Sequence, residues 1–430
     1  MRALFLTNFY PPASRGGYEQ WCQEVAERLR PRHQVVVLTS RFGRDALPAS
    51  DPDWVRRDLH LEMDLNTMRN GIRFFTSRTA RERDNVACIV RQVRDFAPDV
   101  VLVWGMWNLD RGLAAAVESL APGRVAYYIG DYWASLPSQH VHYWDAPART
   151  WLSAVPKRAL AAVARRMLAR RKSADLHFEH ALFPTRFMQT EYERLGIVPR
   201  RSRVVYGGAD TSVDVGEPEA PSRSGTHALL YVGRLTHDKG VHTAIEALGL
   251  LVRQDQFQHL RLAIVGTGEA EASLRRLVLE QRLEDQVTFF GHQPAGAVRA
   301  FYRQADVLVF PSIWQEPFGR VLVEAMAAGL VVVGTATGGA AEILTNDETA
   351  LTFPPCDAEA LARAVKRLVE SEPLRARLAD AASRRARARF GIDRMSAEIE
   401  AYLMEMTAGA TAEIGGIDPI NDWTEGDIPD

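Results

Sequence analysis

Short apolar runs alternate with amphipathic stretches along most of the chain, and this alternation constrains the fold more than any other feature. In the first half, each run has the length and composition of a buried strand and is followed by residues with helical apolar spacing. The runs are residues 3–6, 34–38, 100–104, 125–129 and 181–183. Strands that alternate with helices predict a parallel sheet covered by helices, which is the architecture of a doubly wound α/β protein.

The second half repeats this pattern more regularly. Its apolar runs are residues 228–232, 260–265, 287–290, 307–310 and 330–333, each followed by a turn and a stretch that can form a helix. We therefore predict two Rossmann-like domains, each built on an open parallel sheet. Such sheets bind ligands at the carboxyl ends of their strands, so we expect ligands in a cleft between the two domains.

The chain length agrees with two domains, because 430 residues exceed one core of ordinary size. Between Thr211 and Gly225 the sequence turns to glycine, proline, serine and acidic residues without periodicity, which predicts a linker. The predicted boundaries are 1–210 for the N-terminal domain, 211–225 for the linker and 226–390 for the C-terminal domain. The acidic tail, residues 410–430, is predicted to be disordered.

Overall charge and cysteine content exclude some classes of function. The formal net charge of -2 provides no general attraction for nucleic acid, so we expect no nucleic-acid partner. The three cysteines lie far apart, without histidine or cysteine at metal-ligand spacing, which predicts reduced thiols and no metal site. The first apolar stretch is too short for a secretory signal, and no run of about 18 apolar residues is present. We therefore expect a cytoplasmic protein.

The basic segment 156–172 has two interpretations. Leu160, Val163, Met167 and Leu168 share one helical face, and cations cover much of the remaining surface. An ordinary domain helix would bury that apolar face and expose the basic one, and we favour this interpretation. Alternatively, the helix could lie on an anionic membrane and hold the protein at its inner face.

Residues 316–324 place two carboxylates around a predicted strand-to-helix turn. Pro317 disfavours a helical conformation for the residue before it and can start the following helix, so Glu316 is expected in the turn and Glu324 on the helix. Because the N-terminus of a helix binds phosphate well, this segment is typical of a nucleotide-sugar enzyme.

Two cations, Arg234 and Lys239, follow the first predicted strand of the second half. A guanidinium can bind phosphate oxygens in bidentate fashion, and an ammonium can neutralise the charge on a departing nucleoside diphosphate. The alternative is a pair of solvated surface cations. The presence of the Glu316 turn in the same predicted domain favours a diphosphate site.

Two glycine-containing loops also follow predicted strands. Gly266 and Gly268 lack the third glycine of the dinucleotide fingerprint, whose place Glu271 takes, so a dehydrogenase is disfavoured and a structural turn lining the cleft is expected. Gly16 and Gly17 could let the first loop approach a ligand, or could belong to a simple connection.

The first half has an aromatic-rich region, residues 127–133, followed by His140 and His142. Aromatic faces and a carboxylate suit a sugar or another hydroxyl-bearing acceptor. A hydrophobic cluster beneath a long loop is the alternative. The two histidines alternate as neighbours on a strand would.

Taken together, these motifs resemble the family-4 retaining glycosyltransferases, which have the GT-B fold. The resemblance covers most of the chain. It rests on Gly16 and Gly17, on Gly233, Arg234, Lys239 and Gly240, on residues 265–268, and on Glu316 and Glu324 in their turn. It implies a hexosyltransferase of carbohydrate biosynthesis that moves a sugar from a nucleoside-diphosphate sugar to an acceptor hydroxyl. It implies no metal or other cofactor, and a last helix, residues 391–409, that crosses back to the first domain.

The resemblance also implies roles for individual residues. Arg234 and Lys239 would hold the donor diphosphate, Glu316 would face the sugar, and Glu324 would bind the ribose hydroxyls. Further donor contacts would come from Gly16, Gly17, Gly233, Gly266, Phe318, Gly319 and Arg320, with His292 beside the nucleobase. The acceptor would meet Tyr132, Trp133, His140 and His142.

The chain departs from the family at one position. Many members carry a His-Asp pair where this sequence has Gly130-Asp131, so the place of the histidine is vacant. We assign its catalytic role to Asp131, or to His140 or His142 folding back.

The spacing of the two glutamates bears on the mechanism. Eight residues of continuous helix would separate them by about 12 Å along its axis, too far for a shared acid/base pair. We therefore favour front-side attack, in which the diphosphate accepts the proton of the acceptor and the two cations stabilise its charge. The alternatives are a nucleotide-sugar epimerase on the same fold and a non-catalytic sugar-nucleotide-binding module.

Overall fold

The computed structural model describes residues 1–13, 16–44, 51–65, 69–147, 151–170, 174–211 and 228–413. They divide into two compact units. The first contains residues 1–183, 189–205 and the chain from Ser396 onward, and the second contains 184–188 and 206–395. The predicted linker lies outside the described residues except at Thr211, as does the acidic tail beyond residue 413.

The first unit is built on seven parallel strands in the order β3-β2-β1-β4-β5-β6-β7. The strands are β1 (Arg2–Leu6), β2 (Gln34–Ser40), β3 (Val55–Leu59), β4 (Val100–Val103), β5 (Val125–Tyr128), β6 (His180–Phe183) and β7 (Arg201–Val204). The central strand β1 pairs with β2 on one side and β4 on the other, which explains why its apolar side chains are fully buried. The two edge strands, β3 and β7, are less apolar and were not predicted.

The helices of the first unit connect these parallel strands. They are α1 (Gly17–Leu29), α2 (Asn70–Thr76), α3 (Arg78–Phe96), α4 (Arg111–Leu120), α5 (Gln139–Asp145), α6 (Trp151–Ala169) and α7 (Arg186–Arg194), of which the first residues of α7 belong to the second unit. From Ser396 onward, α14 (Ile392–Glu413) also packs in this unit. There Glu400 binds Arg32 at 2.6 Å and His33 at 2.7 Å, and the Tyr402 hydroxyl lies 3.0 Å from His180 Nδ1.

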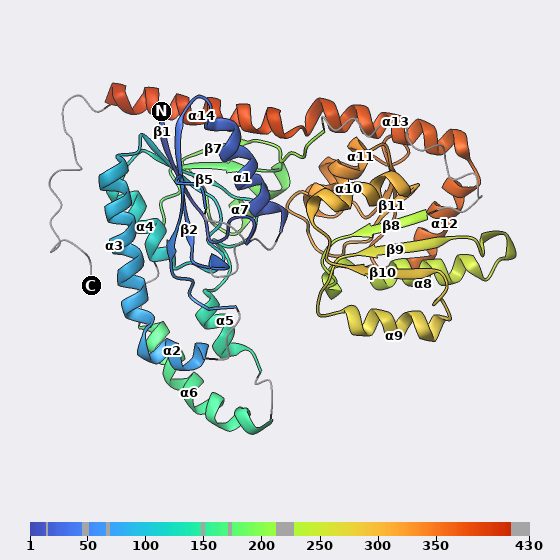
Figure 1. The fold of residues 1–430 in the computed structure, drawn as a ribbon, viewed down its shortest axis with the longest axis horizontal. Helices are drawn as coiled ribbons and strands as arrows, with labels where there is room; N and C mark the ends of the chain where they lie inside the picture. The colour runs from blue at the N-terminus through green and yellow to red at the C-terminus, as the bar shows by residue number, and fades with distance from the viewer. Residues whose placement is uncertain are drawn as a thin grey trace. The chain divides into compact units, whose positions relative to one another are not determined.

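The second unit has six parallel strands in the order β10-β9-β8-β11-β12-β13. They are β8 (Ala228–Val232), β9 (Arg261–Val265), β10 (Val287–Gly291), β11 (Val307–Phe310), β12 (Val331–Gly334) and β13 (Leu351–Thr352). Its α-helices are α8 (Val241–Val252), α9 (Glu271–Gln281), α10 (Ala295–Gln304), α11 (Arg320–Ala327), α12 (Ala358–Val369) and α13 (Glu372–Arg389). Figure 1 shows α8 and α9 on one side of this sheet and α10 and α11 on the other. Both halves therefore have the predicted doubly wound α/β architecture.

The unit boundary differs from the predicted break at residue 210, because a short segment after β6 binds within the second unit. Thr185 Oγ1 donates a hydrogen bond to the Pro317 carbonyl at 2.8 Å, and the Phe187 amide donates to Glu342 Oε1 at 2.7 Å. Residues 206–210 are joined to the same unit through the bridge between Ala209 and Gly391. Contacts of this kind are made by residues far apart in sequence, so composition alone did not reveal them.

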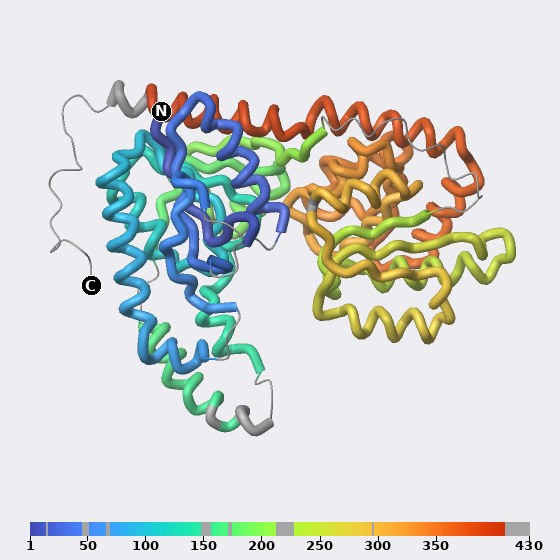
Figure 2. Tube along the Cα trace, viewed as in Figure 1, coloured from blue at the N-terminus to red at the C-terminus, as the bar shows by residue number. Residues whose placement is uncertain are grey.

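Three helices of the first unit, α2, α5 and α6, form what we call the helical lobe, which Figure 2 shows extending beyond the sheet. A small core joins them: Phe74 of α2, Trp144 of α5, and Ala161 and Ala164 of α6 are buried together. The lobe thus has its own packing in addition to its attachment to the sheet.

Candidate functional site

The strongest candidate site lies in the second unit, where β11 leads into α11. β11 is entirely buried, Glu316 lies in the turn after it, and Glu324 lies on the helix, as the sequence predicted. Gly319 caps the helix with φ +102°, a conformation that favours glycine, and supplies no side-chain cap to the first amides of the helix. These amides are suited to an anionic group.

Glu316 binds Lys239 directly. Lys239 Nζ lies 2.6 Å from Glu316 Oε1, and the side chains are only 15% and 10% exposed. Ser312 Oγ donates to the same carboxylate oxygen at 2.6 Å, and the Ser312 carbonyl accepts a hydrogen bond from Thr335 Oγ1 at 2.6 Å. Two residues predicted to serve the diphosphate and the sugar separately therefore form one ion pair.

The loops that carry these two charges are bound to each other through their backbones. The Ile313 and Trp314 amides both donate to the Asp238 carbonyl, at 2.8 and 3.0 Å. Gly240, with φ +67°, lies so close to Pro311 that a Cβ would fall 2.0 Å from the Pro311 carbonyl oxygen. The loop after β8 can therefore approach the loop after β11 only with glycine at this position.

A second pair of glycines supports the Glu316 turn from β12. The Gly339 amide donates to the Glu316 carbonyl at 2.6 Å, and a Cβ on Gly338 or Gly339 would collide with the backbone of Glu316 or Pro317. The sequence analysis did not single out these glycines, although a Gly-Gly pair shortly after a strand could have indicated a close backbone contact. With Thr185 bound to Pro317, they hold the turn in place.

Glu324 forms a second charged cluster. Arg320 Nε donates to Glu324 Oε1 at 2.7 Å, and the Tyr302 hydroxyl donates to Oε2 at 3.0 Å. Burial, and then the nearby Glu324 charge, raise the pKa of Tyr302 well above its usual range, so it remains a donor. Tyr302 was missed because it comes from α10, and no local pattern links it to the motif.

The other predicted donor residues lie around these clusters. Arg234 is exposed at the end of β8 and His292 is exposed after β10. The Phe318 side chain is buried and packs edge-on against Phe390, so only its backbone could serve a ligand. Gly16 is exposed and caps α1 in an extended conformation, and Gly17 begins that helix.

Gly233 and Gly266 pack against each other. A Cβ on Gly266 would fall 1.8 Å from the Gly233 carbonyl oxygen, and the Gly233 amide donates to the Val265 carbonyl at 3.0 Å. These glycines join the turns after β8 and β9, which agrees with the expected structural turn. Their contact with a donor stays a prediction.

In the first unit, Tyr18 fills the space beside Gly130. A Cβ on Gly130 would lie 2.5 Å from Tyr18 Cε2. The Tyr18 hydroxyl accepts a hydrogen bond from the Gly130 amide at 3.2 Å and lies within hydrogen-bond distance of the Trp104 and Tyr128 carbonyl oxygens. An aromatic ring from α1 therefore fills the space that a side chain at position 130 would need, and what replaces the role of the histidine stays a prediction.

Asp131, the next residue, is a carboxyl group of unusual proton affinity. Burial, partly offset by a hydrogen bond from the Trp133 amide and increased by the Glu19 charge, raises the pKa of Asp131 to about 7. Tyr192 donates a hydrogen bond to the Asp131 carbonyl at 2.9 Å, which fixes this turn. The group could hold a proton near neutral pH.

The predicted acceptor residues do not gather at one place. Trp133 is only 3% exposed and packs in the core near Tyr127 and Phe178, so the prediction that its face binds an acceptor was wrong. Tyr132 is partly exposed, and its role stays a prediction.

The two histidines lie on α5 and not on a strand, because Ser138 caps this helix by accepting a hydrogen bond from the Val141 amide at 3.4 Å. His140 is buried with its ring 5.2 Å from that of Phe74, and His142 is exposed. The assignment of the family histidine's role to either residue stays a prediction.

Among the residues that the structure describes, no group of three or more His, Cys, Asp or Glu side chains is arranged to hold a metal ion. Within the same residues, no helix is both long and apolar enough to cross a membrane.

Comparison with protein families agrees with this geometry. Residues 15–213 match the family described as Glycosyltransferase Family 4, and residues 217–385 match Glycosyl transferases group 1. The chain belongs to the glycosyltransferases. In this glycosyltransferase, the group 1 match contains both charged clusters, from Lys239 to Glu324.

Individual relatives cover part of the chain. A glycogen synthase from Mycobacterium tuberculosis (strain ATCC 25618 / H37Rv) is 34% identical over 192 residues, which are 45% of this chain and 43% of the relative. A D-inositol 3-phosphate glycosyltransferase from Pseudarthrobacter chlorophenolicus is 35% identical over 164 residues, 38% of this chain and 39% of the relative. The chain thus spans less than half the length of these curated relatives.

Solved structures match over nearly the whole chain. HepE from Anabaena, in complex with UDP and glucose, covers 94% of this chain and 99% of its own, with a TM-score of 0.67 and 19% identity. Sucrose-phosphate synthase from Thermosynechococcus elongatus covers 95% and 99%, with a TM-score of 0.68 and 20% identity. These likenesses confirm the GT-B fold.

Proposed function

We propose that this chain transfers a hexosyl group, with retention of anomeric configuration, from a nucleoside-diphosphate sugar to an acceptor hydroxyl. The observation that carries the proposal is the buried pair of Lys239 and Glu316, fixed at the carboxyl ends of adjacent strands. Strand ends of this kind are where open α/β sheets bind their ligands. The UDP and glucose bound by HepE support a nucleotide-sugar donor.

Different charged residues would bind different parts of the donor. Lys239 and the exposed Arg234 would bind the diphosphate, together with the first amides of α11. Because Lys239 and Ser312 both bind Glu316 Oε1, we assign Oε2 to a sugar hydroxyl. The ion pair with Glu316 keeps the Lys239 ammonium oriented, which lowers the cost of reorganisation during the reaction.

The proposed reaction is front-side attack without an enzyme nucleophile or a metal. The acceptor oxygen bonds to the anomeric carbon on the face that the diphosphate leaves, and the bond from that carbon to the diphosphate oxygen breaks. The acceptor proton passes to the departing phosphate oxygen, whose charge Lys239 and Arg234 stabilise. Glu324, held by Arg320 and Tyr302, is assigned to the ribose hydroxyls rather than to proton transfer.

A donor screen tests the proposal. Nucleoside diphosphates and then sugar nucleotides should raise the melting temperature, since a ligand that binds only the folded state stabilises it. With the best donor and candidate hydroxyl acceptors, nuclear magnetic resonance of the product should show the anomeric configuration of the donor. A product of opposite configuration would refute retention, and a chelator that abolished turnover would refute independence from metal.

The Glu316 assignment has its own test. Glu316→Gln should reduce transfer strongly while nucleoside-diphosphate binding changes little, because only the sugar contact and the ion pair are lost. The matched control is Glu342→Gln, which alters a glutamate bound to the Phe187 amide and the Tyr206 hydroxyl. Isomerised sugar formed from donor alone would instead support the epimerase alternative.

A further inference from the structure

The basic helix α6 presents the face that it was expected to bury. Leu160, Val163 and Met167 are 46%, 53% and 39% exposed. The helix packs instead through Ala161 and Ala164, whose small side chains let it approach the lobe core. α6 is thus packed in its unit with a solvated basic face, as the favoured interpretation expected, but three of its large apolar side chains are exposed as well.

Exposed apolar side chains concentrate on the helical lobe. On α2, which shares the lobe core through Phe74, Ile72 and Phe75 are also exposed. The lobe and the segment leading into it contain seven of the thirteen large exposed apolar side chains among the described residues: Ile72, Phe75, Leu136, Val155, Leu160, Val163 and Met167. Apolar side chains gathered in this way usually mark a surface that contacts a partner or a membrane.

Cations flank this apolar surface on α6. At 100° per residue, Arg166 and Arg170 lie beside the stripe formed by Leu160, Val163 and Met167. Residues 151–170 contain no acidic side chain. An exposed apolar stripe bordered by arginines matches an anionic lipid surface, where acyl chains lie beneath phosphate groups.

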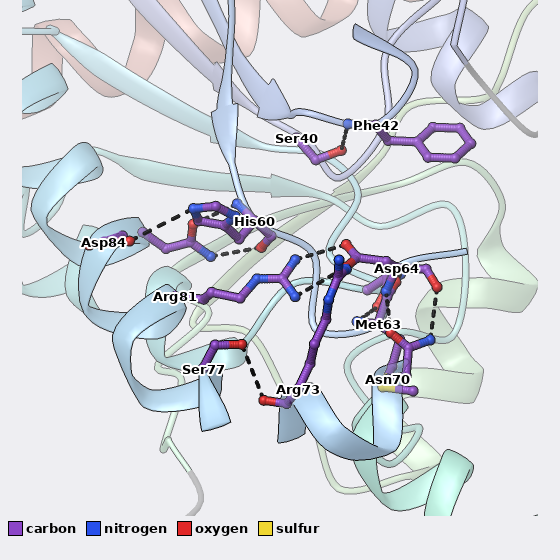
Figure 3. Close-up of polar contacts among 12 residues, drawn as sticks. Ser40, Phe42, His60, Met63, Asp64, Asn70, Arg73, Ser77, Arg81 and Asp84 are labelled. Carbon is purple, nitrogen blue, oxygen red and sulfur yellow. Dashed lines mark hydrogen bonds and ion pairs between the residues drawn. The ribbon is translucent and has the colours of Figure 1, made fainter. Parts of the chain in front are cut away.

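The lobe is held firmly on the unit that carries it. Figure 3 shows Arg73 of α2 and Arg81 of α3 both directed at Asp64, in the segment after β3. The Asn70 amide group donates to the Asp64 carbonyl at 2.8 Å, and the Asp64 amide donates to Asn70 Oδ1 at 3.1 Å. These bonds fix the start of α2, which shares the lobe core with α6.

We propose that the helical lobe docks on the surface of an anionic lipid bilayer. Leu160, Val163 and Met167 enter the boundary between headgroups and acyl chains, and Arg166 and Arg170 bind lipid phosphates. The charge pattern favours an anionic bilayer over a second copy of the chain. Two copies of this face, which is rich in arginine and has no acidic residue, would repel each other. The inference does not depend on the proposed reaction, and its test requires no donor or acceptor.

Vesicle sedimentation with the full chain tests the proposal. Vesicles of phosphatidylcholine mixed with phosphatidylglycerol should sediment the protein at low salt, and vesicles of phosphatidylcholine alone should not. Each arginine near an anionic surface changes partitioning by about fivefold, so Arg166→Gln and Arg170→Gln together should reduce binding by about 25-fold. The matched control neutralises two exposed arginines elsewhere, Arg194 and Arg363.

The apolar stripe is tested separately. Leu160→Glu, Val163→Glu and Met167→Glu together should abolish sedimentation, whereas the same changes at exposed Leu195, Val198 and Leu279 should leave it intact. Circular dichroism checks that each variant is folded. A single probe, Val163→Trp, avoids this concern, because its fluorescence should shift to the blue with anionic vesicles only.

Three results with vesicles would overturn the proposal. They are equal binding to neutral and anionic vesicles, sedimentation that survives the triple glutamate change, and a Val163→Trp emission that no vesicle shifts. If sedimentation velocity instead showed a dimer that the triple change dissociates, the surface would belong to a second copy and the membrane proposal would fail.

Discussion

The two sheets share one architecture but organise their polar residues differently. In the second unit, residues identified from motifs meet in compact clusters, Lys239 with Glu316 and Arg320 with Glu324. In the first unit, the candidate Trp133 is part of the core. Of the two candidate histidines on α5, His140 is buried and His142 is exposed. The loops after β8 and β11 lie side by side and bring their charged residues together, whereas the predicted acceptor residues are spread along the connection between β5 and β6.

The largest expected effect tests whether the clusters of the second unit do chemistry. Lys239→Ala should lower turnover by about 10²- to 10³-fold, because a preorganised charge at the leaving group is lost. The measurement is kcat with the best nucleoside-diphosphate sugar, and Lys366→Ala on α12 is the matched control. Near-normal kcat would mean that the ion pair only supports the fold. The second unit would then differ from the first in the packing of its charged residues but not in catalysis.

The next largest effect is on the free energy of unfolding, and it tests whether Trp133 belongs to the core. Trp133→Ala should reduce the free energy of unfolding by about 3 kcal/mol or more, since a large buried side chain leaves a cavity. His142→Ala should change it by less than about 0.5 kcal/mol, because the side chain is exposed. Denaturant unfolding measures both free-energy changes. If both were equally small, Trp133 would not be a core residue and could again be considered for acceptor binding.

The contact of Gly130 with Tyr18 predicts a smaller effect. Gly130→His should cost about 2 kcal/mol of stability, because the new side chain overlaps the tyrosine ring. In a Tyr18→Ala background the same change should cost much less, and a double-mutant cycle measures this coupling. Additive costs would show that the tyrosine does not occupy the histidine position.

The last prediction concerns Asp131 and pH. Its pKa of about 7 in the folded protein lies above the usual value for aspartate, so the folded state holds a proton that the unfolded state releases between about pH 4 and pH 7. Stability from this group is therefore lost as pH rises toward and through 7. Asp131→Asn should raise the melting temperature relative to the unchanged protein more at pH 8 than at pH 5, and exposed Asp285→Asn should show no such difference.

Much of the fold could be predicted from sequence because buried parallel strands are continuous apolar runs. The Glu316 turn could also be predicted, because Pro317 restricts the backbone locally. Tyr302 and Tyr18 could not, since each reaches its partner from another element, α10 or α1. The α5 histidines were misplaced because two alternating residues fit a strand as well as a short helix, and only the Ser138 cap distinguishes them.

The division of the chain between the units has a consequence for the order in which the protein matures during synthesis. Arg32, His33 and His180 are translated before the second unit, but their partners Glu400 and Tyr402 follow that unit in the chain. The first unit therefore waits until the second unit has been translated before α14 can dock on it. The second unit inherits residues 184–188 from upstream and can close around them sooner, so the half made later is the half that is completed first.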